Sequence, residues 1–274
     1  MTNLVVTICV FNWNYGVYLK ELLEKFTPCV NDPRVRMVIC DDGSTDNSIE
    51  IINDYIKCFN VNNISTISVS KNNLGRDVPY KGQLIGLSSF LNHEHLIDDG
   101  FIWFMDADDY FDFHGFNALY NHLLCENPDL YILKVNNFTC GESQRNILEI
   151  KRRISKKPKL WPTVSVTSSL IVSMQFIKKN IDLLLSFNPN YSDVWLDARI
   201  NILGCTDKKY KVIYSDEIVQ RRIHSSGDSS TMPLLRRIKK QCKSFCFFRD
   251  ALSEDFTFTT RTFLLSLIYK LFYK

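Results

Sequence analysis

The first half of the chain alternates short apolar runs with amphipathic stretches, and this alternation restricts the folds that the chain can adopt. The apolar runs have the length of buried strands and cover residues 4–10, 36–40, 64–69 and 101–105. Between them, apolar residues recur at helical spacing over 18–26, over a stretch that Ser44 or Thr45 would cap and that runs to Tyr55, and over 83–91. Strands and helices that alternate in this way predict an α/β fold with a parallel sheet between helices.

The second half of the chain has a looser pattern. Residues 136–165 are polar and basic with little periodicity, and they are expected to form a loop. Apolar spacing predicts further strands at 170–177 and 211–219, and further helices at 181–185, 194–203 and from 234 onward, with a break near 253–255.

The composition is that of one large globular domain, or of one domain with an appended piece. The chain has 274 residues, of which 45% are apolar or aromatic, too many for a disordered protein. The formal charge is only +3, so no strong attraction to nucleic acid is expected.

Cysteine usage and the first residues indicate a cytoplasmic location. The nine cysteines are an odd number without a Cys-x-x-Cys pair, and residues 1–11 lack the basic region and cleavage site of a secretory leader. Both features favour a reducing compartment. No apolar run reaches the roughly 20 residues that a membrane-spanning helix needs.

Polar clusters follow three of the predicted strands. They comprise residues 11–14, 41–46 and 106–109. In open parallel sheets, ligands bind outside the carboxyl ends of the strands, so these clusters are expected along one ligand-binding edge.

The cluster Asp106-Ala107-Asp108-Asp109 holds three carboxylates within four residues. Such carboxylates repel one another, and a fold that gathers them usually needs a cation. Carboxylate oxygens suit Mg²⁺ or Mn²⁺, which would neutralise the charge of a departing diphosphate. A solvated acidic turn that caps the next helix explains the same residues, and the short pattern by itself leaves both readings open.

The three clusters, taken together, resemble the family 2 glycosyltransferases, which have the GT-A fold and invert the anomeric carbon. Residues 11–14, Phe-Asn-Trp-Asn, resemble the family's Pro-Thr-Tyr-Asn segment. Residues 38–46 match its Val-Val-Asp-Asp-Gly-Ser-Thr-Asp signature, and residues 104–109 match its Phe-Leu-Asp-Ser-Asp-Asp motif. The likeness is close over 4–120, weaker to about 230 and lost beyond.

The resemblance implies a Rossmann-like, mostly parallel nucleotide-binding sheet flanked by helices. We therefore expect a GT-A glycosyltransferase domain over 1–230 and a basic, amphipathic helical tail over 231–274.

The family's first two motifs contact the nucleotide, usually uridine. The residues that the resemblance assigns to nucleotide binding are Phe11, Asn12, Trp13, Asp41, Asp42, Arg76, Asp106 and Ala107. Asp41 would accept a hydrogen bond from the N3–H of the base, and such a group rejects bases without that donor. For Asp42 a structural role in the turn is favoured. Packing in the core is the alternative for Trp13, and a surface role is the alternative for Arg76.

The resemblance also implies the residues around the diphosphate. Asp106 and Asp108 would serve the metal, with Asp108 as the direct ligand, and Asp109 would be a second ligand or a helix cap. Arg222 and His224 stand where the family has a Tyr-Arg-Ile-His segment that closes over the diphosphate, so both are candidates for phosphate or metal contact. The Gly/Ser-rich loop that follows suits a lid.

Inverting transfer needs a base that takes the proton of the acceptor hydroxyl. The family takes it from a Glu-Asp pair at a helix start, where this chain has Ser192-Asp193, so the resemblance makes Asp193 the base. Asp197 lies one helical turn later and is the fallback. The alternative is that Asp193 only caps the helix together with Ser192.

The tail places basic residues among apolar ones. From Arg236 to Arg249 there are six Lys or Arg residues and no acidic residue. A basic amphipathic helix pair suits the inner surface of an anionic membrane, and it equally suits packing on the catalytic domain with a solvated basic face. Membrane contact would fit a lipid-linked acceptor, as in bacterial polysaccharide or lipopolysaccharide assembly.

These expectations combine into one function. The chain is predicted to move a sugar from a nucleotide-diphospho-sugar, a UDP-sugar, to a hydroxyl of a saccharide or lipid-linked acceptor with Mn²⁺ or Mg²⁺. The alternatives are another metal-dependent nucleotide-sugar enzyme, such as a nucleotidyltransferase, a DxD phosphatase, or a nucleotide-binding protein without turnover. A nucleotidyltransferase would have a Gly-rich basic loop after the first strand, and residues 11–16 are not one.

Overall fold

The structure is a computed structural model. It describes residues 4–69, 80–92, 100–139, 146–148, 166–191, 194–206, 209–224 and 234–252, and positions 264, 267, 268 and 271. Two predicted site residues, Arg76 and Asp193, lie outside the described residues, as do the proposed lid at 225–233 and most of the second tail helix.

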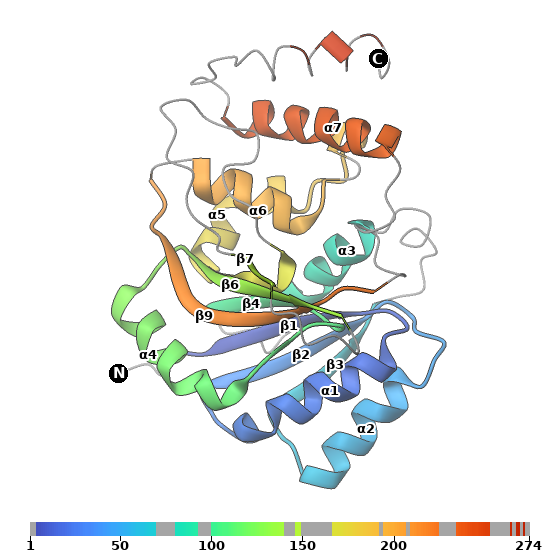
Figure 1. The fold of residues 1–274 in the computed structure, drawn as a ribbon, viewed down its shortest axis with the longest axis vertical. Coiled ribbons are helices and arrows are strands. Elements are labelled where there is room, and N and C mark those ends of the chain that lie inside the picture. The colour runs from blue at the N-terminus through green and yellow to red at the C-terminus, as the bar shows by residue number, and fades with distance from the viewer. Residues whose placement is uncertain are drawn as a thin grey trace.

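The four strands predicted in the first half form one parallel layer. They are β1 (Val6–Asn12), β2 (Val35–Asp41), β3 (Ile64–Ser68) and β4 (Phe101–Asp106). Their order is β3-β2-β1-β4, with every neighbouring pair parallel (Figure 1). The predicted parallel α/β sheet is confirmed for this half of the molecule.

Beyond β4 the sheet becomes mixed. Its further strands are β5 (Tyr110–Phe111), β6 (Leu130–Phe138), β7 (Asn146–Leu148), β8 (Leu170–Ser173) and β9 (Val212–Arg222). The order continues β4-β8-β6-β9-β5, and β8 runs antiparallel to both of its neighbours. β9 is parallel to β6 and antiparallel to β5, while β7 pairs with β6. The expected loop at 136–165 therefore contains strand residues at both 136–138 and 146–148.

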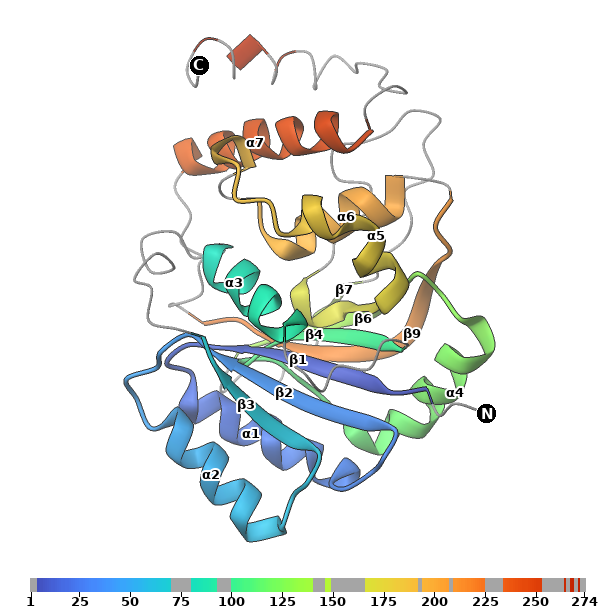
Figure 2. The ribbon, with the colours of Figure 1, turned by 180° about the vertical axis from the view of Figure 1, so that it is seen from behind.

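Helices cover both faces of the sheet, as Figures 1 and 2 show from opposite sides. The helices of one face are α1 (Gly16–Phe26), α2 (Ser48–Phe59) and α4 (Phe116–Glu126). Those of the other face are α3 (Tyr80–Leu91), α5 (Met174–Leu184), α6 (Leu196–Thr206) and α7 (Leu234–Leu252). Alternate residues of the central strands supply the two cores, so Trp103 is buried on the first face and Phe104 on the second.

Two predicted element ends were wrong, and each has a local cause. The predicted strand 170–177 stops at Ser173, whose hydroxyl accepts a hydrogen bond from Phe176 N at 3.1 Å and so starts α5. The N-cap of α2 is Asn47, whereas the Ser44 hydroxyl is used by Asp41. Short 3₁₀ turns complete the fold: η1 (Thr27–Cys29), η2 (Phe113–Gly115), η3 (Thr167–Ser169) and η4 (Pro189–Tyr191).

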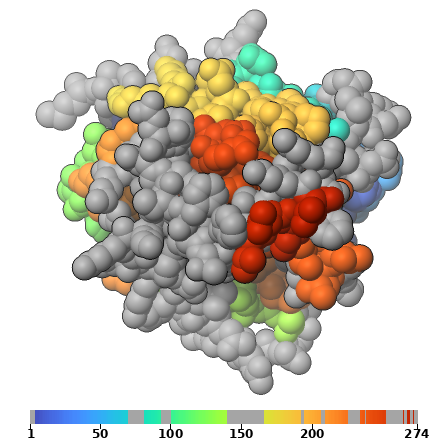
Figure 3. All heavy atoms as spheres, turned by 90° about the horizontal axis from the view of Figure 1, so that it is seen from above, coloured from blue at the N-terminus to red at the C-terminus, as the bar shows by residue number. Residues whose placement is uncertain are grey.

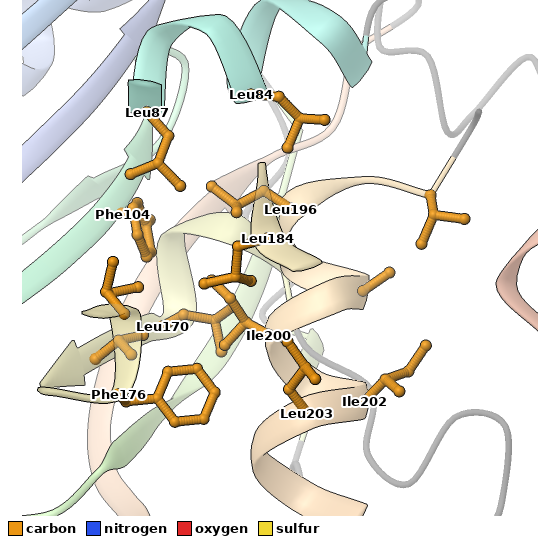
Figure 4. Packing of buried hydrophobic residues seen from close by; sticks show 14 of the residues in the cluster. Leu84, Leu87, Phe104, Leu170, Phe176, Leu184, Leu196, Ile200, Ile202 and Leu203 are labelled. Atoms are coloured by element: carbon orange, nitrogen blue, oxygen red, sulfur yellow. The ribbon is translucent and has the colours of Figure 1, made fainter. Parts of the chain in front are cut away.

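The second core ties α6 to the sheet. Figure 4 shows Leu196, Ile200 and Leu203 of α6 beside Leu84 of α3 and Phe176 of α5. This packing brings the first turn of α6 close to α3, which itself lies against β1 and β2.

α7 packs on the same core from outside. Its buried residues are Cys242, Ser244, Phe245, Cys246, Phe247 and Phe248. Figure 3, which looks down on this end of the molecule, shows α7 at the surface beside the yellow residues that precede α6. Within the described part of the chain, no helix is long and apolar enough to cross a membrane.

Candidate active site

The strand register brings the predicted clusters to one edge of the sheet. Asn12 of β1 stands opposite Asp41 of β2, and Phe11 stands opposite Asp106 of β4. The carboxyl ends of these three strands therefore carry the aromatic, Asp-Asp-Gly and DxD clusters side by side, as the α/β pattern predicted.

Asp41 is 3% exposed, and its carboxylate is held by protein donors. Asn12 Nδ2 donates to Oδ1 at 2.7 Å, the Ser44 hydroxyl donates to Oδ1 at 2.5 Å, and Ser44 N donates to Oδ2 at 3.0 Å. Asn12 Nδ2 also donates to Ser44 Oγ at 3.1 Å. These bonds orient the buried Asn12 amide, and nothing among the described residues donates to its Oδ1. The Oδ1 atom of Asn12 is thus an oriented, buried acceptor next to Asp41.

The aromatic residues of the first cluster differ in burial. Phe11 is half-buried, stacks on Phe104 with ring centroids 6.2 Å apart, and touches α3 at Gly86. A Cβ at Gly86 would lie 3.0 Å from the Phe11 ring, so only glycine allows this approach without displacement. Trp13 is 44% exposed and is therefore not a core residue. Asp42 faces α3, where a Cβ on Gly82 would lie 3.1 Å from its carboxylate.

Both carboxylate oxygens of Asp109 accept hydrogen bonds from other parts of the protein. Asp109 is 4% exposed and accepts hydrogen bonds from Ser168 Oγ at 2.6 Å and from Arg222 N at 2.9 Å. The side chain that caps the next turn is Asp112, which accepts from His114 N at 3.3 Å. Burial, followed by the neighbouring carboxylates, raises the pKa of Asp109 well above its usual value. Asp109 joins the DxD turn to η3 and β9.

Asp106 lies at the end of β4, and its carboxylate accepts a hydrogen bond from a side chain of α3. Gln83 Nε2 donates to Asp106 Oδ1 at 3.0 Å and also to Thr167 Oγ1 at 3.2 Å. Burial and the nearby charges of Asp108 and Asp197 raise the pKa of Asp106 to about 7, against the bond from Gln83, which lowers it. The carboxylate thus occupies a site that favours a compensating cation. Gln83 had no sequence signal, because α3 and β4 are joined only in the folded chain.

Asp108 is paired with His224 from the other end of the chain. Their Oδ2 and Nε2 atoms are 2.8 Å apart, and the two side chains are 15% and 10% exposed. The His224 ring lies against Tyr18, with centroids 5.3 Å apart, and edge-on to Tyr15 at 5.7 Å. Burial, and next the Asp108 charge, raises the pKa of Tyr15. His224, predicted as a candidate for phosphate or metal contact, thus lies beside the DxD turn.

Carboxylate oxygens are suitable ligands for Mn²⁺ or Mg²⁺. In the described part of the chain, no three or more His, Cys, Asp or Glu side chains are grouped so that they could hold a metal ion by themselves. Mg²⁺ commonly takes only one or two protein carboxylates together with substrate phosphates, so Asp106 and Asp108 are candidates for a cation that binds together with a diphosphate.

The two arginines at the end of β9 point to opposite faces. The Arg222 side chain is 5% exposed, pairs with Glu21, and lies 4.7 Å from the ring centroids of both Tyr18 and Phe138. Its Nε donates to the Asp108 carbonyl at 3.2 Å. Arg221, one residue earlier, instead acts electrostatically on Asp197. Arg221 had not been distinguished by sequence reasoning, although the pleat of a strand separates neighbouring side chains.

Asp197 stands in the first turn of α6, near Asp106. Burial raises its pKa, while the positive charges of Lys240 and Arg221 lower it. Lys240 of α7 lies 5.2 Å from the ring centroid of Trp195. Asp193, the residue predicted as base, lies between the described residues Tyr191 and Val194 of the same segment.

Comparison with known families gives a match over most of the chain. The sequence model described as "Glycosyl transferase family 2" matches residues 6–180. A search of curated proteins gave no match.

Several solved structures have a similar fold. Staphylococcus aureus TarS 1–349 in complex with UDP superimposes with a TM-score of 0.61 at 14% identity, covering 96% of this chain and 69% of the other. The same protein with UDP-GlcNAc gives 0.59 at 12% identity, covering 96% and 70%. The mannosyltransferase PcManGT from Pyrobaculum calidifontis, in complex with GDP-Man and Mn²⁺, gives 0.55 at 14% identity, covering 94% and 66%. At these identities the likeness concerns the fold.

Proposed function

The chain belongs to glycosyl transferase family 2 and has the GT-A fold, and from this premise we propose that it is an inverting glycosyltransferase that uses a UDP-sugar. The observation that carries the proposal is the edge of the sheet where the Asp108–His224 pair, Asp106 and the oriented Asn12–Asp41 pair stand side by side. One part of this edge suits a diphosphate with its cation, and the other suits a nucleobase.

The base is proposed to bind at Asn12 and Asp41. Uracil presents its N3–H donor, and the unused Asn12 Oδ1 and the neighbouring Asp41 carboxylate are acceptors for it. The exposed Trp13 ring would cover the base, and Phe11 would lie beneath it. TarS binds UDP and UDP-GlcNAc in its solved complexes, which supports UDP, whereas PcManGT binds GDP-Man.

The diphosphate is proposed to bind through Mn²⁺ or Mg²⁺ at Asp106, Asp108 and His224. A bound divalent cation supplies positive charge to the leaving diphosphate. The chain's own contribution is to hold the two carboxylates at a buried turn and to place the His224 imidazole 2.8 Å from Asp108. The Mn²⁺ complex of PcManGT supports a divalent cation.

The acceptor hydroxyl is proposed to lose its proton to Asp193. The acceptor oxygen forms a bond to the anomeric carbon from the face opposite the diphosphate, and the bond from that carbon to the diphosphate oxygen breaks. The proton passes to the carboxylate, and the nucleoside diphosphate leaves. Asp197 is the alternative base, since it lies near Asp106 on the first turn of α6.

The acceptor is proposed to be a saccharide or a lipid-linked saccharide of bacterial polysaccharide or lipopolysaccharide assembly. Support comes from α7, which is rich in Lys and Arg and whose first residues, Leu234 and Leu235, are 72% and 77% exposed. A basic surface with exposed leucines suits peripheral contact with the cytoplasmic face of an anionic membrane.

A thermal-shift panel tests the donor class. UDP is expected to raise the melting temperature in the presence of Mn²⁺, and less so with a chelator or in Asp108→Asn. Stabilisation by GDP but not by UDP would overturn the assignment of the donor. A sugar nucleotidyltransferase would instead release diphosphate from a nucleoside triphosphate and a sugar phosphate, which the same enzyme preparation can be assayed for.

Asp193→Asn tests the chemistry. The variant is expected to lose transfer by at least about 100-fold, because the base is absent, and to keep the UDP–Mn²⁺ thermal shift. Asp197→Asn is the matched comparison. Full transfer by Asp193→Asn together with loss in Asp197→Asn would move the base to Asp197.

A further inference from the structure

The segment between α5 and α6 carries the proposed base, and Arg199 of α6 donates hydrogen bonds to the backbone of this segment. Arg199 is fully buried. Its Nε donates to the Val194 carbonyl at 2.9 Å, and its Nη1 donates to the carbonyls of Leu184 at 2.8 Å and Ser186 at 2.7 Å. One guanidinium therefore binds the backbone at both ends of the segment.

α7 also contacts this segment. The Tyr191 hydroxyl donates to Asp250 Oδ2 at 2.6 Å, and the Tyr191 ring packs edge-on against Phe247 with centroids 5.2 Å apart. Lys243 Nζ donates to the Pro189 carbonyl at 3.1 Å. Asp250 is itself oriented by Arg249, whose Nε donates to Oδ1 at 2.9 Å.

These contacts form one stripe along α7. The residues of the stripe are Lys240, Lys243, Phe247 and Asp250. They are three or four residues apart, which places them on one side of the helix. The stripe runs along η4 and reaches Trp195 at the start of α6, so α7 contacts the segment on both sides of Asp193.

We propose that α7 is a positioning element of the active site, and that the Tyr191–Asp250 hydrogen bond sets the place of the segment that carries the base. The inference rests on the proposed function. Asp193 is two residues from Tyr191, and a chain spans at most about 3.5 Å per residue, so the anchoring of Tyr191 limits where Asp193 can lie. Misplacement of a reacting group by about 1 Å can cost roughly 100-fold in rate.

The inference assigns the basic helix α7 a role in positioning the active site. α7 does not act only as an attachment to the surface of the domain, because the contacts of its stripe fall on the segment that carries the proposed base. The same contacts leave the nucleotide edge at Asn12 and Asp41 untouched. Loss of the contacts should therefore lower the rate of transfer and spare donor binding.

Tyr191→Phe and Asp250→Ala test the proposal, with Tyr210→Phe as the matched control. Tyr210 is also a buried tyrosine whose hydroxyl bonds a polar side chain, Asn180, at 2.9 and 3.2 Å, but it lies at the far end of α6. Tyr191→Phe is expected to lower kcat about 10- to 100-fold with the KM for donor and the UDP–Mn²⁺ thermal shift unchanged. The double variant should be no worse than either single variant, since both remove one interaction.

Hydrogen exchange gives a readout that does not depend on the reaction. Peptides covering residues 186–197 should exchange faster in Tyr191→Phe than in the wild type, with β1 and β4 unchanged. The inference is overturned if that exchange is unaltered, if Tyr191→Phe keeps kcat within about twofold of Tyr210→Phe, or if donor binding weakens in parallel. If the wild type has no transferase activity and no response to UDP, the proposed function fails, whereas altered exchange would still place α7 as the support of this segment.

Discussion

Replacement of Arg222 by alanine tests whether this arginine, at the end of β9, stabilises the fold or binds the diphosphate. The Arg222 guanidinium lies between the rings of Tyr18 and Phe138, pairs with Glu21 and donates to the carbonyl of Asp108. A side chain with this many protein contacts is expected to stabilise the fold that supports the DxD turn. Arg221→Ala on the opposite face of the strand is the matched control.

The magnitude follows from the contacts of Arg222. Two cation–π contacts at 4.7 Å contribute about 0.5–1 kcal/mol each, and the bond to the Asp108 carbonyl contributes about 1 kcal/mol. The ion pair adds less than about 1 kcal/mol, because the Glu21 side chain is 38% exposed and water screens it. The sum is roughly 3 kcal/mol, which corresponds to a fall in melting temperature of roughly 6–10 °C for a chain of this size.

Calorimetry or fluorescence melts without nucleotide measure this fall directly. Arg221→Ala should melt within about 2 °C of the wild type, since it leaves those contacts in place. The reasoning is refuted if Arg222→Ala melts like the wild type and only loses affinity for UDP. That result would return Arg222 to the role of a diphosphate ligand.

Two further predictions concern buried charge. The pKa of Asp106 is raised from 3.8 to about 7 in the folded state. Asp106 therefore stabilises the folded state at acid pH, and without a divalent cation this stabilisation is lost as the pH rises from about 4 to 7. Mn²⁺ binds the ionised form, so its thermal shift should grow over the same range, and melts of wild type and Asp106→Asn across pH 5–8 check both trends. Arg199→Met should cost about 3–5 kcal/mol in urea unfolding, because the carbonyls that the buried guanidinium binds lose their donor; a cost below about 1 kcal/mol would contradict the role given to Arg199.

The resemblance of the three motifs led to the family, and the strand pattern placed them on one edge. Runs of buried strand length and helical spacing between them are local properties, so β1 to β4 and their parallel direction were predictable. The strand pairing in the mixed half of the sheet was not predictable, because β8 is only four residues long and its antiparallel pairing depends on partners far away in sequence.

The roles within the site depended on tertiary contacts. Asp109 was predicted as ligand or cap, but its carboxylate is bound by Ser168 and by the backbone of β9, which no local pattern reveals. Arg222 and His224 are close in sequence, yet Arg222 is enclosed by aromatic rings and His224 reaches Asp108. A lone arginine carries no signal for which face of a strand is buried.

The sequence by itself determined the fold class, the family and the edge of the sheet on which the chemistry lies, because strand period, helix period and short motifs are all written in neighbouring residues. Only the tertiary structure decided which side chains share that edge. Gln83 is joined to Asp106 across 23 residues, and Tyr191 of the segment before α6 is joined to Asp250 of α7 across 59 residues. Such contacts arise from packing, and packing is a property of the whole fold.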